Sequence, residues 1–112
     1  MKKLAFAGLL SLVMAVPAFC HPPKAIDLKL GDAGMLTVTI THQVKDPAKH
    51  YIDDVKVEVN GKKAVVQLFS VQTDKDTQTA VYLLHGLVKG DKIKVSADCN
   101  KGGELSKELL VP

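Results

Sequence analysis

Aromatic residues and long runs of one charge are both scarce in this sequence. The 112 residues include three phenylalanines, two tyrosines and no tryptophan, and the formal net charge is +3. Lys2 and Lys3 belong to an N-terminal leader, and without them 13 basic residues face 12 acidic ones. A chain with nearly balanced charge, no basic block and few aromatic rings is not expected to bind nucleic acid or an anionic membrane surface.

Signatures of several large enzyme classes are also absent. The chain has no glycine-rich phosphate loop, no dinucleotide-binding fingerprint and no nucleophile elbow with an ordered Ser/His/Asp set. No stretch predicts a long helix, because proline, glycine and β-branched residues are spread throughout. These absences direct attention to the few histidines and cysteines.

The first 20 residues are typical of a cleavable signal peptide. Lys2 and Lys3 form a positive region, residues 4–16 form an apolar run, and Pro17-Ala18 precede a small-residue cleavage zone. The apolar run of about 13 residues is too short to span a bilayer comfortably. We therefore expect residues 1–20 to be removed and the protein to be periplasmic or secreted.

The position of the cleavage decides which residue begins the mature chain. Cleavage after Ala18 retains Cys20, whereas cleavage after Cys20 makes His21 the N-terminus. A lipid-anchored Cys20 is a third option, disfavoured by the bulky Phe19 beside it. In each case residues 21–112 are long enough for one small domain and not for two.

Short alternating segments predict that this domain is all-β. Residues 26–30 and 36–40 flank a Gly/Asp turn, and Asn60-Gly61 supplies the positive backbone torsions of a tight hairpin turn. The seven predicted strands are residues 26–30, 36–40, 55–59, 64–69, 79–87, 93–97 and 104–111. Strands of this number and spacing predict an immunoglobulin-like β-sandwich of about seven strands.

The fifth of these segments contains a histidine within an apolar pattern. In residues 79–87, the alternation places Val81, Leu83, His85 and Leu87 on one face. A core or edge position is therefore expected for His85.

Two other histidines flank one short polar loop. His42 follows the strand 36–40, and His50 precedes the strand 55–59. Imidazole is the commonest metal ligand near neutral pH, and strand ends hold ligands rigidly. The spacing alone also suits two exposed loop histidines with no such role.

Cys99 stands at the end of another predicted strand. It pairs with Cys20 if cleavage leaves that residue on the chain, or it is a buried free thiol, or it is a thiolate bound to a metal. The sequence spacing leaves these three interpretations open.

A family resemblance joins these residues. His21-Pro22-Pro23, His42, His50-Tyr51-Ile52 and Cys99-Asn100, in this order, resemble most of the signature of the desulfoferrodoxin and superoxide reductase iron domain. The similarity covers essentially all of residues 21–112. It implies an immunoglobulin-like sandwich that binds mononuclear non-haem iron, and the positions matching the family's ligands are His21, His42, His50 and Cys99.

The chain departs from the family pattern at two places. Gly102 stands where the family has its last histidine ligand, and Phe19 and Cys20 stand where it has an acidic and a basic residue. The matching ligands are therefore three histidines and one cysteine, a set that also suits tetrahedral zinc.

The resemblance implies reduction of superoxide by one-electron transfer, with a separate electron donor as partner. Two alternatives remain. HYIDDVKVEVNGK and KGDKIKVSADCNKGGE also resemble the Z subunit of the periplasmic thiosulfate-oxidation carrier, which implies a non-catalytic interaction module without a metal. A mature N-terminal His21 would instead favour copper, since its amine and imidazole chelate together.

Overall fold

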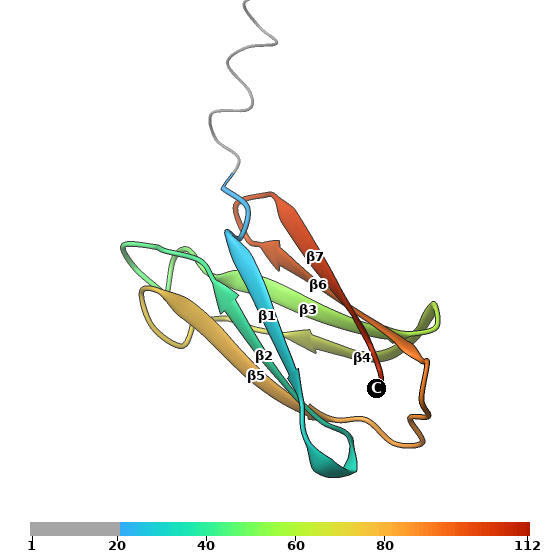
Figure 1. Cartoon of the computed structure of the whole chain (residues 1–112). Coiled ribbons are helices and arrows are strands. Elements are labelled where there is room, and N and C mark those ends of the chain that lie inside the picture. The colour runs from blue at the N-terminus through green and yellow to red at the C-terminus, as the bar shows by residue number, and fades with distance from the viewer. Residues whose placement is uncertain (1–20) are drawn as a thin grey trace, which may run out of the picture.

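The computed structural model describes residues 21–112, which form two antiparallel sheets packed as a sandwich (Figure 1). The predicted all-β sandwich of seven strands is confirmed. Within the described residues, no helix is both long and apolar enough to cross a membrane. The elements are β1 (Ala25–Leu30), the 3-10 turn η2 (Asp32–Gly34), β2 (Met35–Thr41), β3 (Ile52–Val59), β4 (Lys62–Leu68), β5 (Thr77–Leu83), β6 (Lys92–Cys99) and β7 (Glu104–Leu110).

The smaller sheet has the order β1-β2-β5, and the larger one the order β4-β3-β6-β7. The predicted hairpin turn joins β3 to β4, with positive φ at Asn60 (51°) and Gly61 (83°). Such a turn matches the right-handed twist of the two strands, so β4 stays beside β3. Because β4 pairs in the larger sheet, β5 has only β2 as a neighbour and is an edge strand of the smaller sheet.

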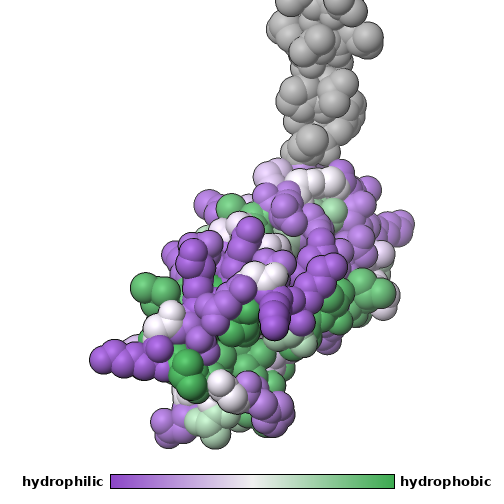
Figure 2. Space-filling view, turned by 90° about the vertical axis from the view of Figure 1, so that its right-hand side faces the viewer, coloured by the Kyte–Doolittle hydropathy of each residue, from purple (hydrophilic) through white to green (hydrophobic). Residues whose placement is uncertain are grey.

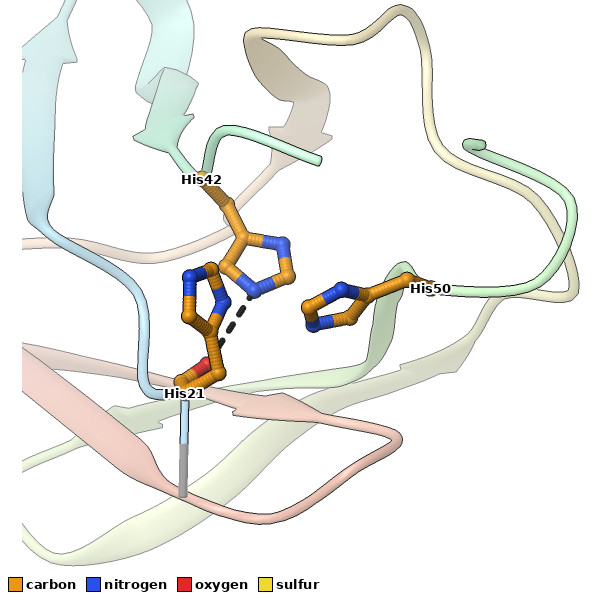
Figure 3. Close-up of side chains that lie close together, drawn as sticks. All are labelled: His21, His42 and His50. Carbon is orange, nitrogen blue, oxygen red and sulfur yellow. Dashed lines mark hydrogen bonds between the residues drawn. The ribbon is translucent and has the colours of Figure 1, made fainter. Parts of the chain in front are cut away.

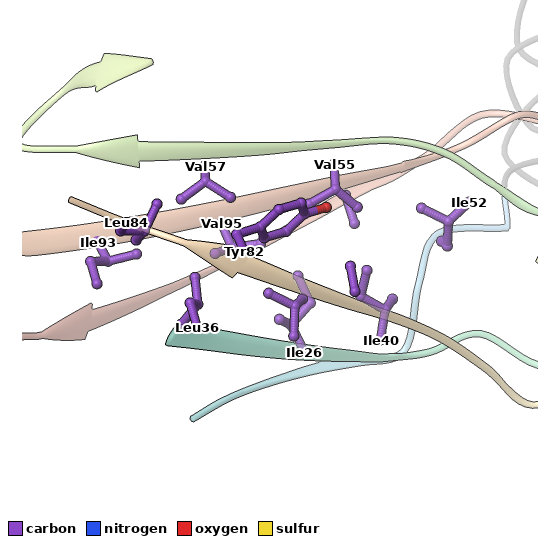
Figure 4. Close-up of a cluster of buried hydrophobic side chains, with 13 residues drawn as sticks. Ile26, Leu36, Ile40, Ile52, Val55, Val57, Tyr82, Leu84, Ile93 and Val95 are labelled. Carbon is purple, nitrogen blue, oxygen red and sulfur yellow. The ribbon is translucent and has the colours of Figure 1, made fainter. Parts of the chain in front are cut away.

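The core lies between the sheets and follows the period of two along each strand. Every second residue of β2 and β6 is buried, and the side chains of the two sheets meet in Figure 4. Burial of one large aliphatic side chain contributes about 1.5–3 kcal/mol, which makes this layer the main source of stability. The large aliphatic residues that are fully buried are Leu36, Val38, Ile40, Ile52, Val55, Val57, Ile93 and Val95.

Tyr82 is the aromatic residue of this core. Its hydroxyl group is buried without a hydrogen-bond partner among the described residues. Burial raises the pKa of Tyr82 to about 12, so the phenol stays neutral at physiological pH.

The prediction for residues 79–87 was wrong about where the strand ends and about which of its side chains face the core. The strand β5 ends at Leu83, and Ala80 and Tyr82 face the core while Val81 and Leu83 are about half exposed (55% and 52%). His85 lies beyond the strand and is exposed, so it is not a core residue.

Several predictions fall on residues outside the described range. These are the signal peptide at residues 1–20, its cleavage site, and the pairing of Cys20 with Cys99. Cys99 is the single cysteine of residues 21–112 and carries a free, buried thiol.

Candidate metal centre

Four segments meet at the end of the sandwich where β2 and β6 finish and β1 and β3 begin. The pairing of Ala25 with Thr41 and of Ile52 with Cys99 brings these strand ends side by side. His42 follows β2 directly, and Cys99 is the last residue of β6. The histidines preceding β1 and β3 complete the set, so all four predicted ligands reach this end.

The three imidazole rings of His21, His42 and His50 form a tight cluster (Figure 3). One ring nitrogen from each lies within 4.8 Å of the others. The ring centroids are 5.4 Å apart for His21 and His42, 4.7 Å for His21 and His50, and 4.9 Å for His42 and His50. Three nitrogens at this separation can hold one metal ion.

Cys99 adjoins the cluster through its sulfur. Sγ lies 3.1 Å from Nε2 of His50, and the backbone N–H of Lys101 donates to Sγ at 3.4 Å. Burial raises the pKa of the Cys99 thiol, while the backbone N–H groups of Lys101 and Gly102 and the Lys101 charge act against that rise. The thiol is therefore protonated at neutral pH until a cation displaces the proton.

His50 is held in its neutral form. Burial lowers its pKa, and so do the neighbouring charges of His42, His21 and Lys101. A neutral imidazole keeps one nitrogen lone pair free, which is the form that binds a metal. The donor set of three imidazoles and one thiol fits a transition-metal ion better than Ca²⁺ or Mg²⁺, which prefer oxygen ligands.

The cluster is closed on one side and open on the other. His42 is 1% exposed, whereas His21 is exposed and His50 half-buried. A groove of about 540 Å³ is lined by His21 and His50 and also by Lys45, Asp46 and Lys101. A small solute can therefore reach the cluster from the groove, past two lysines and one aspartate.

The loop after Cys99 contacts the segment that contains His21 and holds it in place. A Cβ atom at Gly103 would lie 2.7 Å from Cα of Pro22, so only glycine allows this contact. The backbone N–H of His21 donates to the carbonyl oxygen of Gly102 at 3.4 Å. Gly102 has open space around its Cβ position.

Two further residues differ from what the sequence indicated about the site: His85 lies away from the cluster, and Gln72 lies against it. His85 follows β5 at the opposite end of the sandwich, since Leu83 pairs with Met35 at the start of β2. It is therefore not part of the histidine cluster. Gln72, by contrast, was not singled out from the sequence, although it is 3% exposed and its Oε1 lies 2.8 Å from Nδ1 of His42. Its position in a polar loop gave no sign of burial.

Comparison with known proteins finds no family model that matches this chain and no curated protein that is detectably similar to it.

Proposed function

We propose that this protein binds one redox-active transition-metal ion, iron in the first place, through His21, His42, His50 and Cys99. The observation that carries the proposal is the convergence of four separate segments on one point. Three imidazole nitrogens lie within 4.8 Å of one another, and the Cys99 sulfur lies 3.1 Å from His50. Nitrogen and sulfur donors at these separations suit one shared metal ion.

Each residue has a distinct part in holding the ion. His42 is buried and supplies a fixed ligand on the closed side, while His21 and His50 border the groove. The Cys99 thiol loses its proton on metal binding, which makes affinity for the metal rise with pH. The backbone N–H of Lys101, 3.4 Å from the sulfur, stabilises the thiolate that results.

The groove and the donor set together favour a small anionic oxidant as substrate. Lys45 and Lys101 outnumber Asp46 along the groove, and this net positive charge attracts anions toward the side where His21 and His50 lie. His21, His42, His50 and Cys99 would hold a ferrous ion, whose oxidation would supply the one electron that, with two protons, reduces superoxide to hydrogen peroxide. We propose this superoxide reductase-like activity, in a periplasmic or secreted setting, with an external electron donor.

Metal analysis of the protein purified from the exported fraction tests the proposal. We expect close to one iron per chain, and an absorption band after oxidation that disappears in the Cys99→Ser variant because it arises from the thiolate. Zinc or copper in place of iron would retain the site but overturn the iron assignment. Absence of any metal from the protein, also after incubation with Fe²⁺, would overturn the metal-binding proposal.

Rapid mixing of the ferrous protein with superoxide then tests the activity. Oxidation of the iron should be faster in the native protein than in Cys99→Ser at equal iron content. Equal rates in the two proteins would contradict a role of the thiolate in the reaction.

Copper is the second candidate, and the position of His21 favours it. If the predicted leader of residues 1–20 is removed, the amine and the imidazole of His21 form a chelate within the cluster. Mass spectrometry of the exported protein fixes its first residue. Copper binding that weakens when one alanine precedes His21 would support this candidate, and unchanged copper binding would contradict it.

A further inference from the structure

Gln72 is a buried amide in the loop between β4 and β5, and it lies against His42. The loop is fixed there by its backbone as well, because the N–H of His42 donates to the carbonyl oxygen of Asp76 at 2.9 Å. The Gln72 amide makes three polar contacts, each with a different group. Oε1 lies 2.8 Å from Nδ1 of His42, and Nε2 lies 2.7 Å from the carbonyl oxygen of His42 and 2.9 Å from that of Asp74.

These contacts allow a single orientation of the amide. Both neighbours of Nε2 are backbone carbonyl oxygens, which only accept hydrogen bonds. The NH₂ group of Gln72 must therefore face them, and its two hydrogens are both used. A flipped amide would place Oε1 against two other oxygens inside the protein, and an unsatisfied buried group costs about 1–3 kcal/mol.

The orientation of the amide in turn determines the tautomer of His42. Oε1 of Gln72 is an acceptor, so Nδ1 of His42 carries the hydrogen. In the neutral ring Nε2 is then the nitrogen with the free lone pair. This nitrogen faces the cluster and lies 3.3 Å from the carbonyl oxygen of His21, as Figure 3 shows. Two lone pairs face each other across that contact, an arrangement that a cation between them relieves.

We infer that Gln72 is a positioning residue that locks His42 in the Nδ1–H tautomer and so presents Nε2 to a metal. The part of this inference that concerns metal affinity rests on the proposed function, whereas the tautomer does not. Without Gln72, the nearest acceptor for His42 is the carbonyl oxygen of His21. The ring then places its hydrogen on Nε2, where it blocks the ligand atom.

The tautomer is measured first in the metal-free protein by ¹⁵N NMR of the imidazoles, at a pH about two units above the ordinary imidazole pKa. We expect Nδ1–H for His42 in the native protein and a shift toward Nε2–H in Gln72→Leu. Nε2–H in the native protein, or unchanged Nδ1–H in Gln72→Leu, would overturn the inference. The native measurement decides the matter even if Gln72→Leu does not fold.

Zn²⁺ affinity is measured next, by competition with a chelator. Gln72→Leu should bind Zn²⁺ about 10 to 100 times more weakly than the native protein, as for other partners of metal-bound histidines. Equal affinity of the native and Gln72→Leu proteins would contradict the positioning role.

Gln78 provides the matched control. It is 4% exposed and donates to the hydroxyl group of Thr73 and to the carbonyl oxygen of Thr79, and neither hydrogen bond involves an imidazole. Gln78→Leu should therefore leave the tautomer of His42 and the Zn²⁺ affinity unchanged. A native protein that shows the Nδ1–H tautomer but binds no metal would overturn the proposed function and leave the tautomer lock established.

Discussion

The two ends of the sandwich use their polar side chains in different ways. At the end distant from the histidine cluster, Asp91 accepts hydrogen bonds from the N–H of Val88 and the side-chain amide of Asn60, and Asn60 accepts one from the N–H of Lys92. These side chains complete the hydrogen bonding of the turns. At the cluster end, Asn100 and Asp74 complete turns in the same way, but ring nitrogens and a sulfur also face one another. Polar groups left over after the backbone is satisfied are what a ligand can bind.

Exposed apolar side chains lie at both ends. Met35, Leu83, Val88 and Leu110 are at least half exposed near the distant end, and Leu68 and Val71 near the cluster end. In Figure 2 hydrophilic side chains predominate, and hydrophobic ones lie among them mainly in the lower half. The two ends are separated by the seven residues of β2, or about 20 Å. Substitutions at one end should therefore leave the other unaffected.

The largest difference is expected between the two histidines His42 and His85. His42→Ala removes a proposed metal ligand, leaves a cavity and removes the hydrogen-bond partner of Gln72 Oε1. Zn²⁺ affinity should therefore fall at least about a hundredfold. The free energy of unfolding should fall by about 3 kcal/mol. His85→Ala, at an exposed position, should change neither quantity, with stability within about 0.5 kcal/mol. Chelator competition and urea denaturation measure both, and a large effect of His85→Ala would refute the separation of the ends.

A smaller effect on Zn²⁺ affinity is expected from substitutions at Gly102 and Gly103, which lie beside the segment that contains His21. Gly102 and Gly103 have φ of 106° and 103°, so alanine is similarly strained at both, by about 1 kcal/mol. Only at Gly103 would the added methyl group meet Pro22. Gly103→Ala should therefore displace His21 and weaken Zn²⁺ binding about tenfold, whereas Gly102→Ala should not. Equal Zn²⁺ affinities in the two variants would show that His21 is not held by this contact.

The sequence predicted the strands well because β-branched and aliphatic residues alternate in most of them. The predicted segments 55–59 and 93–97 fell short, since β3 begins at Ile52 and β6 continues to Cys99. The backbone ladder extends there through aspartates, which have low strand propensity. In β5 the period was ambiguous, because every residue from Ala80 to Leu84 is apolar or aromatic. Alternation cannot choose a face in such a run.

The candidate site was predicted in part. Strand-end positions indicated His42, His50 and Cys99, and the family resemblance added His21; the structure brings all four together. The metal itself stays a prediction. Gln72 and Gly103 were not predicted as part of the site, because their roles depend on contacts with His42 and Pro22 that lie far away in sequence. Such contacts between loops leave no periodic signal.

Opposite pH dependences are expected for one aspartate at each end. At the cluster end, burial and then the adjacent Asp98 raise the pKa of Asp54 above 3.8. Asp54 thus stabilises the fold in its protonated form below pH 3.8, and this stability is lost as the pH rises through its raised pKa. Asp54→Asn should therefore raise the free energy of unfolding at neutral pH.

At the distant end, hydrogen bonds from the N–H of Val88 and from Asn60 lower the pKa of Asp91 below 3.8. Its stabilising effect is present above pH 3.8 and is lost as the pH falls through the lowered pKa. Asp91→Asn should therefore reduce stability at neutral pH and have little effect near the lowered pKa. Thermal unfolding between acid and neutral pH compares the two variants. If both substitutions changed the stability at neutral pH in the same direction, the environments assigned to Asp54 and Asp91 would be contradicted.

The smallest effect is expected at Leu83, and it tests the face of β5 directly. Threonine has a similar strand propensity and is more soluble, and Leu83 is 52% exposed on the outer face. Leu83→Thr should change the free energy of unfolding by less than about 0.5 kcal/mol. A loss of about 2 kcal/mol or more would indicate a residue packed in the core. In that case Val81, Leu83 and His85 would face the core, as the alternation in residues 79–87 predicted.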